Sequence, residues 1–202
     1  MIRKKIGVLG GSFDPVHKGH VALGQAAVME GGLEKLIVMP AHVQPFKIGR
    51  EFADDDHRLA MCRLAFEEVE HAEISDYEIK HTEISYTFDT LAYLKNVFPD
   101  SKLYFITGTD SFLDVEYWRK GKDLLQSYGF MVSVRPGYKE KELEERIRYY
   151  EAVYGTDIIW LSHQMPDVSS TEIKARRNKN LSIHDLIPES VERYINEHKL
   201  YL

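Results

Sequence analysis

The chain is 202 residues long, with 44% hydrophobic and 29% charged residues. These values are typical of globular proteins and exclude wholesale disorder, and the length suits one α/β domain spanning residues 1–202. The formal net charge of −6 disfavours a nucleic-acid-binding protein, although a cleft with local cations and backbone amides could still bind phosphate. No apolar run is long enough to cross a bilayer, so a membrane partner is not expected.

The single cysteine and the first residues both favour a cytoplasmic location. Cys62 cannot form an internal disulfide, and within the apolar segment 58–64 it is most simply a small core residue. Residues 1–5 lead directly into an apolar run and lack the hydrophobic segment and cleavage site of a secretory signal. The sequence leaves open whether the chain forms a homo-oligomer.

Short apolar runs alternate with longer helical segments along almost the whole chain. This alternation predicts βαβ units with right-handed crossovers, and therefore an α/β fold whose mostly parallel central sheet is covered by helices on both faces. Ligands of such sheets bind beyond the carboxyl ends of the strands, so the loops that follow the strands should carry the function. The expected strands are Lys5–Leu9, Lys35–Met39, Ala72–Asp76, Leu103–Thr107, Phe130–Val134 and Ile158–Leu161.

The helices are bounded by recognisable stop signals. Gly31 and Gly32 follow the first helix and Pro99 follows the third, as expected at helix C-termini. The segment 139–148 alternates in charge sign, which is typical of a solvated helix face. The expected helices are Lys18–Glu30, Asp55–Val69, Thr87–Phe98, Lys122–Ser127, Lys139–Tyr154, Ser170–Arg177 and Pro188–His198.

The most informative segment follows the first strand and reads GGSFDPVHKGH over residues 10–20. Gly10 and Gly11 allow the backbone to approach a phosphate closely, and the following helix offers unpaired N–H groups and the positive end of its dipole. His17 and His20 lie three residues apart, so both rings should reach the same group from one helical face. Zinc is a poor alternative, because no third ligand lies nearby in the sequence. The segment therefore predicts an anion site that contains proton donors.

This segment resembles the signature of the HxGH nucleotidyltransferases, a superfamily with a Rossmann-like, three-layer α/β/α fold. Its members transfer a nucleotidyl group from a nucleoside triphosphate to a phosphate and release pyrophosphate. The dinucleotide fingerprint Gly-x-Gly-x-x-Gly is absent, which disfavours a conventional NAD-dependent dehydrogenase. The resemblance implies that Gly10, Gly11, Ser12 and Phe13 line the ATP site, mostly through the main chain, and that His17 and His20 donate hydrogen bonds to its phosphates.

The loop after the second strand contains a proline, an aromatic residue and cations. Lys47 is either a solvated lysine on a surface loop or part of a substrate lid that places a point charge on a phosphate. Pro45-Phe46-Lys47 is similar to the Pro-His-Lys element of pyridine-nucleotide adenylyltransferases, with Phe46 in place of the usual histidine. The resemblance therefore implies a substrate-binding and catalytic role for Lys47.

The segment Ser85-Tyr86-Thr87-Phe88-Asp89-Thr90 precedes the third expected helix. Ser85 or Thr87 could cap this helix, and the charge of Asp89 is favourable in its first turn. The same pattern resembles nicotinate mononucleotide adenylyltransferases, in which the start of the helix offers main-chain N–H groups to the nicotinate carboxylate. The resemblance makes Ser85 and Thr87 substrate-binding residues.

Two further motifs follow the fourth and fifth strands. Gly108 and Asp110 precede Trp118 at the spacing found in the same family, where the tryptophan stacks on the pyridine ring. Trp118 could also be a core residue, but its polar neighbours favour a half-exposed ring, and Asp110 could either bind a ribose hydroxyl or cap a helix. Arg135 begins an Arg-Pro-Gly element that family members often carry, which implies a substrate-binding role.

The last motif covers residues 168–174 and combines hydroxyls, a helix start and a cation. Such a cluster caps a helix and can also bind a second phosphate. It resembles the Ile-Ser-Ser-Thr-x-Ile-Arg element of the superfamily, with Lys174 at the position of the usual arginine. Lysine keeps the charge but lacks the bidentate fork, so either Lys174 or Arg177 could take the arginine's role. The resemblance assigns Ser169, Ser170, Thr171 and Lys174 to the ATP site.

The motifs together extend from Gly10 to Lys174 and resemble the nicotinate mononucleotide adenylyltransferase family. The implied substrates are ATP and nicotinate mononucleotide, and the implied products are nicotinate adenine dinucleotide and pyrophosphate, a step of NAD biosynthesis. Mg²⁺ is expected to arrive with ATP and to keep several waters, so no protein ligand is assigned to it. The alternatives are an adenylyltransferase with a nicotinamide mononucleotide or phosphopantetheine acceptor, and a non-catalytic nucleotide sensor.

Overall fold

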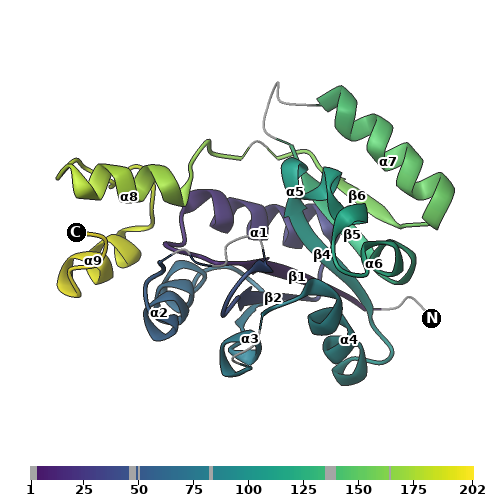
Figure 1. Ribbon diagram of the computed structural model, residues 1–202, viewed down its shortest axis with the longest axis horizontal. Coiled ribbons are helices and arrows are strands. Elements are labelled where there is room, and N and C mark those ends of the chain that lie inside the picture. Colours follow the sequence, from purple (N-terminus) through teal and green to yellow (C-terminus); the bar gives the residue numbers. More distant parts are fainter. Residues whose placement is uncertain (1–3, 46–48, 50, 82–83, 135–139, 164) are drawn as a thin grey trace.

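A computed structural model of the chain describes every residue except 1–3, 46–48, 50, 82–83, 135–139 and 164. Six strands form one sheet in the order β3-β2-β1-β4-β5-β6, and every neighbouring pair is parallel. Figure 1 shows the sheet between layers of helices. The strands are β1 (Lys5–Gly11), β2 (Lys35–Pro40), β3 (Ala72–Ile74), β4 (Lys102–Gly108), β5 (Gly129–Ser133) and β6 (Ile158–Leu161).

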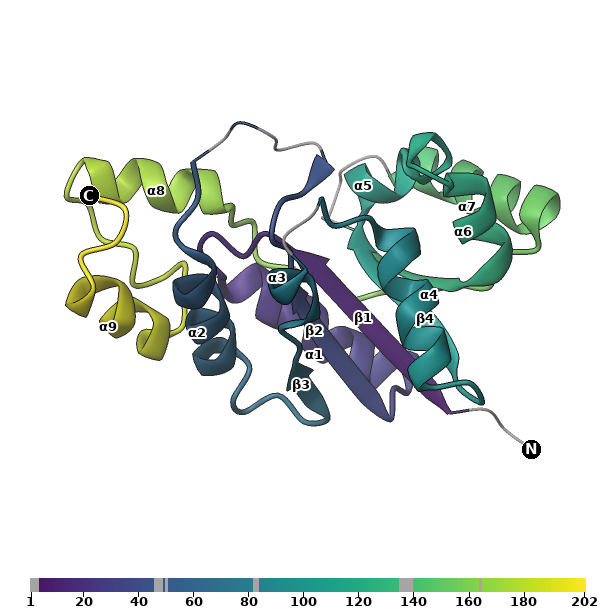
Figure 2. The same cartoon turned by 60° about the horizontal axis from the view of Figure 1, so that its bottom comes forward.

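The helices lie along the sheet and at its two ends. Both views place α8 and α9 at one end of the molecule and α6 and α7 at the other (Figures 1 and 2). The helices of the described residues are α1 (Lys18–Gly31), α2 (Asp55–Ala65), α3 (Tyr77–Lys80), α4 (Thr87–Val97), α5 (Thr109–Leu113), the 3-10 helix η2 (Val115–Tyr117), α6 (Gly121–Ser127), α7 (Glu140–Tyr154), α8 (Ser170–Asn178) and α9 (Glu189–Glu197).

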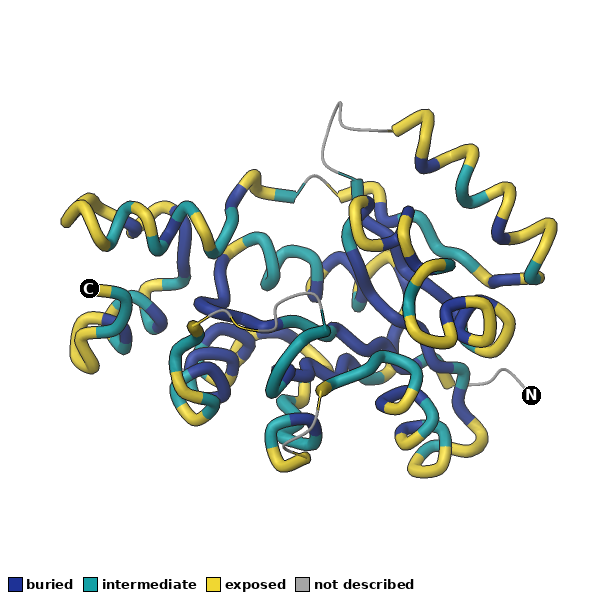
Figure 3. The backbone as a smooth tube through the Cα atoms, viewed as in Figure 1, coloured by how far each residue is buried: buried dark blue, intermediate teal, exposed yellow. Residues whose placement is uncertain are grey.

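Alternation along the strands divides the core into two clusters, one on each face of the sheet. In β1, Leu9 belongs to the cluster that includes residues of α1, α2, α8 and α9, whereas Val8 belongs to the cluster that includes residues of α4 to α7. The central strands β1, β2, β4 and β5 are therefore buried from both sides, as Figure 3 shows by their dark colour, whereas the edge strands β3 and β6 are mostly half-buried. This double burial explains why the strand sequences are continuous apolar runs. The Rossmann-like, three-layer α/β/α prediction is confirmed, and the sheet of the described residues is wholly parallel.

The strand order places a topological switch point between β1 and β4, which are neighbours in the sheet although β2 and β3 lie between them in the sequence. The chain leaves these two strands toward opposite faces, so a crevice opens beyond their carboxyl ends. Gly10 and Gly11 end β1, and Gly108 ends β4. The glycine-containing motifs found in the sequence therefore meet at this edge of the sheet.

The expected elements are all present, with ends that differ by a few residues. The largest difference is in α2, which was expected to continue to Val69 but ends at Ala65, with the Phe66 N–H bonded to the Cys62 carbonyl. Three short elements were not expected: α3, α5 and η2. Cys62 is buried in the core, as predicted. Among the described residues, no helix is long and apolar enough to cross a membrane.

Candidate active site

Two clefts lie beyond the carboxyl ends of β1 and β4, and Ser111 contributes to both. The histidine cleft has a volume of about 440 Å³ and brings the starts of α1 and α8 together with the start of α5, which directly follows β4. The tryptophan cleft has a volume of about 270 Å³ and lies between the start of α4 and the segment 117–119. The predicted site residues in the histidine cleft are His17, His20, Gly108, Asp110, Ser169, Ser170 and Thr171; those in the tryptophan cleft are Gly10, Gly11, Ser85, Thr87 and Trp118.

The two histidines share one face at the start of α1, as the spacing predicts. His17 is the N-cap, His20 lies in the first turn, and their rings are stacked with centroids 3.6 Å apart. The backbone N–H of His17 donates to Nδ1 of His20 over 3.2 Å. Because Nδ1 of the His20 ring is an acceptor, the proton of the neutral ring is on Nε2. His20 therefore presents a donor from Nε2, which is the form that a phosphate oxygen requires.

Hydrogen bonds and packing against buried side chains fix the loop between Gly11 and His17. Arg58, which is 1% exposed, donates from Nη1 to the carbonyl of Ser12 over 2.6 Å. The Ser12 hydroxyl donates to Oε1 of Gln44, a residue of the tryptophan cleft. The Phe13 ring is buried against His20, so any contact of Phe13 with a nucleotide comes from its main chain. These contacts fix the backbone that precedes the two histidines.

Asp14 is the centre of a buried polar cluster behind the same loop. Its carboxylate is 3% exposed and accepts from Nζ of Lys174 over 2.6 Å, from the Tyr201 hydroxyl over 2.8 Å and from the Ala53 N–H over 3.0 Å. The cluster joins residues that are up to 187 positions apart in the sequence. Burial raises the pKa of the Tyr201 hydroxyl, and the Asp14 charge raises it further, so Tyr201 stays a donor. We call these three side chains, Asp14, Lys174 and Tyr201, the Asp14 cluster.

The two candidate cations of the last motif are both paired with protein groups. Lys174 forms its ion pair with Asp14 and is about one-third exposed. Arg177 donates to the Asn196 side chain and to the Leu200 carbonyl, so it ties α8 to the C-terminal segment. The geometry places Lys174 closer than Arg177 to the loop that leads into the histidines, because only Lys174 of the two contacts Asp14.

The serines of the same motif include the expected helix cap, whereas their contact with a phosphate stays a prediction. Ser169 is the N-cap of α8, and its hydroxyl accepts from the Glu172 N–H over 3.2 Å. Ser170 donates to the carbonyl of Pro15 over 3.0 Å, which joins the start of α8 to the loop before α1. The positive ends of two helix dipoles therefore border the histidine cleft, a favourable arrangement for an anion.

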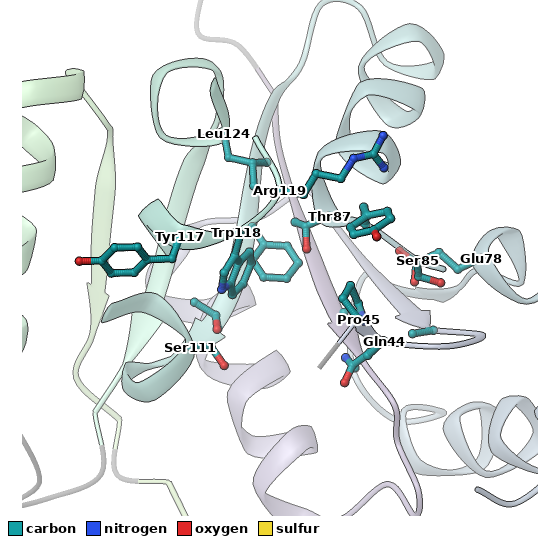
Figure 4. A pocket seen from close by; sticks show the side chains of 16 residues that line it. Gln44, Pro45, Glu78, Ser85, Thr87, Ser111, Tyr117, Trp118, Arg119 and Leu124 are labelled. Atoms are coloured by element: carbon teal, nitrogen blue, oxygen red, sulfur yellow. The ribbon is translucent and has the colours of Figure 1, made fainter. Parts of the chain in front are cut away.

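The tryptophan cleft combines an aromatic ring with the start of α4 (Figure 4). Trp118 is half-buried and contacts Phe105 edge to face, with centroids 5.9 Å apart. Its ring lies across the cleft from Thr87 in the view of Figure 4. The N-cap of α4 is Tyr86, so neither Ser85 nor Thr87 caps the helix, and Thr87 is its first residue. A planar ligand on Trp118 would have a helix N-terminus nearby.

Glu78 of α3 is a buried carboxyl in this cleft. It is 9% exposed and accepts from the Thr90 hydroxyl. Burial raises the pKa of the Glu78 carboxyl, and the Thr90 hydroxyl, which stabilises the ionised form, lowers it in part. Glu78 could not be predicted from the sequence, because α3 is a single turn that has no detectable apolar period.

Asp110 lies in the first turn of α5, after the N-cap residue Gly108, and is exposed in the histidine cleft. The capping interpretation of Asp110 is therefore wrong, whereas its contact with a ribose stays a prediction. Lys47 and Arg135 lie outside the described residues. No cluster of metal-ligating side chains is present in the part of the chain that the structure describes.

Comparison with known proteins agrees with this geometry. Residues 8–176 match the family model described as cytidylyltransferase-like. A protein from Clostridium botulinum, named probable nicotinate-nucleotide adenylyltransferase, is 36% identical over 198 residues, which cover 98% of each chain. A protein from Thermoanaerobacter with the same name is 35% identical over 98% of this chain and 94% of its own. The chain belongs to the nicotinate-nucleotide adenylyltransferase family.

A solved structure of a distant protein has the same fold. It is described as Plasmodium falciparum nicotinic acid mononucleotide adenylyltransferase complexed with NaAD, and it matches 98% of this chain and 98% of its own with a TM-score of 0.81 at 21% identity. A second structure of that protein, complexed with APC, matches with a TM-score of 0.79 at 21% identity. Members of this family are nucleotidyltransferases, so the resemblance inferred from the motifs is confirmed.

Proposed function

We propose that this chain transfers the adenylyl group of ATP to nicotinate mononucleotide, giving nicotinate adenine dinucleotide and pyrophosphate. A phosphate oxygen of the mononucleotide forms a bond to the α-phosphorus of ATP, the bond from that phosphorus to the bridging oxygen breaks, and its electron pair leaves with pyrophosphate. The observation that carries the proposal is the stacked pair of His17 and His20 in a cleft that meets a second, aromatic cleft at Ser111.

The histidine cleft is the proposed ATP site. Phosphoryl chemistry of this kind needs alignment and charge stabilisation more than covalent assistance. The Nε2–H of His20 and the N–H groups at the starts of α1 and α8 would stabilise the charge that grows on the phosphate oxygens in the transition state. The hydroxyls of Ser169 and Thr171 and the backbone N–H of Ser170, whose own hydroxyl donates to Pro15, would supply further donors, and Asp110 would bind the ribose.

The tryptophan cleft is the proposed acceptor site. The nicotinate ring would stack on Trp118, and its carboxylate would lie at the start of α4 beside Thr87. A carboxylate gains more than a neutral carboxamide from a helix N-terminus, because it carries a full negative charge. Lys47 remains a predicted contact of the acceptor phosphate, and Arg135 remains a predicted contact of the substrate.

Mg²⁺ enters this proposal as part of the substrate MgATP. The described residues hold no group of three or more metal-ligating side chains, and Mg²⁺ commonly keeps several waters while it bridges phosphate oxygens. The histidine cleft fits such a complex, since the His20 ring, the starts of α1 and α8 and the hydroxyls of Ser169 and Thr171 offer donors to phosphate oxygens.

The test is pyrophosphate release from MgATP with nicotinate mononucleotide, nicotinamide mononucleotide or phosphopantetheine as the acceptor, measured in parallel with ATP binding. We expect a strong preference for nicotinate mononucleotide. Turnover only with phosphopantetheine would assign the chain to a different acceptor. ATP binding without pyrophosphate release from any acceptor would instead support a nucleotide sensor.

A further inference from the structure

Arg119 directly follows Trp118 in the sequence and lines the tryptophan cleft. It is the single cationic side chain among the described residues that line this cleft. The other charged side chain of that described lining is Glu78, whose burial favours its neutral form. Arg119 is therefore the positive charge that the described lining offers to a ligand. A carboxylate on the acceptor ring would gain from this charge, and a neutral carboxamide at the same position would gain much less.

The guanidinium of Arg119 is held at the start of α4 by two contacts. Nη1 donates to Oδ2 of Asp89 over 2.8 Å, and the guanidinium carbon lies 4.3 Å from the centroid of the Tyr86 ring. Tyr86 is the N-cap of α4 and Asp89 lies in its first turn, on either side of Thr87 in the sequence. Figure 4 shows the Arg119 side chain extending above Thr87 toward that helix. The planar fork presents five N–H donors, so one ion pair with Asp89 leaves others for a second carboxylate.

We propose that Arg119 is a specificity-determining residue, which favours an acceptor that carries a carboxylate on its ring over the corresponding carboxamide. This inference rests on the proposed function, because it needs a pyridine mononucleotide in the tryptophan cleft. Asp89 competes with the acceptor for the same guanidinium. Removing the charge of Arg119 and removing the charge of Asp89 should therefore have opposite effects on selectivity.

The experiment measures kcat/KM for nicotinate and nicotinamide mononucleotides with saturating MgATP, for the wild type and for Arg119→Gln, Arg119→Lys and Asp89→Asn. Lys120→Gln is the matched control, because it makes the same change in charge at the next residue, whose ammonium lies over the Phe88 ring. Equilibrium binding of both mononucleotides to each variant without ATP separates binding from chemistry. The series is repeated at low and high salt, since an ionic contact at a half-exposed side chain is screened.

For Arg119→Gln we expect about a tenfold loss of kcat/KM with the nicotinate acceptor, as a charged hydrogen bond typically contributes, and less than about a twofold change with the nicotinamide acceptor. Arg119→Lys should retain part of the preference, and Asp89→Asn should increase it about twofold. Lys120→Gln should match the wild type. The preference of the wild type should decline as salt rises.

Two results would overturn the inference. If Arg119→Gln lowers turnover of both acceptors equally, the side chain only supports the fold of the cleft. If Asp89→Asn changes selectivity in the same direction as Arg119→Gln, the ion pair is a structural link and Arg119 does not face the acceptor. A wild-type protein that turns over neither mononucleotide would refute the proposed function instead, so the two failures are distinguishable.

Discussion

Substitution of Tyr201 by phenylalanine tests whether the C-terminal segment stabilises the loop that carries the histidines. The change removes the hydroxyl that donates to Asp14 over 2.8 Å and keeps the volume of the ring, which packs against the core. Asp14 keeps its contacts with Lys174 and with the Ala53 N–H. The substitution therefore isolates one hydrogen bond to a buried carboxylate, without a cavity.

The expected loss of stability follows from the burial of Asp14, which is 3% exposed and cannot replace the lost donor with bulk water. A hydrogen bond to a charged group contributes about 1.5–3 kcal/mol, and the two donors that remain place the loss near the lower end, at about 1.5–2 kcal/mol. For a chain of this length, each kcal/mol shifts Tm by roughly 2–4 °C, so Tm should fall by about 3–8 °C.

The assay is thermal unfolding followed by circular dichroism at neutral pH, supported by the midpoint of urea unfolding. Tyr117→Phe is the control, because the Tyr117 side chain is 77% exposed and its hydroxyl should contribute nothing to stability. If Tyr201→Phe has the same Tm as the wild type within about 1 °C, the reasoning is refuted, since a buried charge-assisted bond cannot be lost without cost.

Three further predictions concern the clefts. His20→Ala should lower kcat by a factor of about 10²–10³ with little change in ATP affinity, because one oriented donor to a developing charge is removed. Steady-state kinetics and ATP titration measure these two quantities. An unchanged kcat would contradict the prediction. Trp118→Ala should raise KM for nicotinate mononucleotide by about tenfold or more through loss of stacking, whereas a selective effect on KM for ATP would exclude that role. The raised pKa of Glu78 means that its contribution to stability is complete below the ordinary glutamate pKa of about 4.5 and is lost as pH rises through the folded-state value. As pH rises from about 4.5 to 8, the Tm of Glu78→Gln should therefore rise relative to the Tm of the wild type. A Tm difference that stays constant across that range would contradict the raised pKa of Glu78.

Most of the fold follows from local patterns that a single sequence contains. The apolar runs are long enough to identify every strand, and the glycines and proline after α1 and α4 mark helix ends correctly. What could not be found are elements too short to show a period. Helix α3 has four residues and η2 has three, so neither completes enough turns to display an apolar face.

The candidate site divides in the same way. His17, His20 and Ser169 are predictable because each acts within one helix start, where spacing in the sequence equals spacing in the structure. The Asp14 cluster is not predictable, because Lys174 and Tyr201 are 160 and 187 positions away from Asp14. For Lys174, the motif in the sequence indicates a contact with phosphate. It does not reveal the ion pair with Asp14, because Asp14 lies outside the motif.

The pairing of Lys174 bears on which groups would attract a triphosphate to the proposed ATP site. Its charge is matched by the buried carboxylate of Asp14, and the whole chain carries a formal net charge of −6, so a surplus of cationic side chains does not explain attraction of a triphosphate. The starts of α1 and α8 border the histidine cleft, and the start of α4 borders the tryptophan cleft. Each contributes about half an elementary positive charge through N–H groups that do not titrate. Binding of phosphate should consequently depend on the placement of these three helix starts, and the Asp14 cluster is positioned to maintain it, since Asp14 precedes α1 and Lys174 belongs to α8.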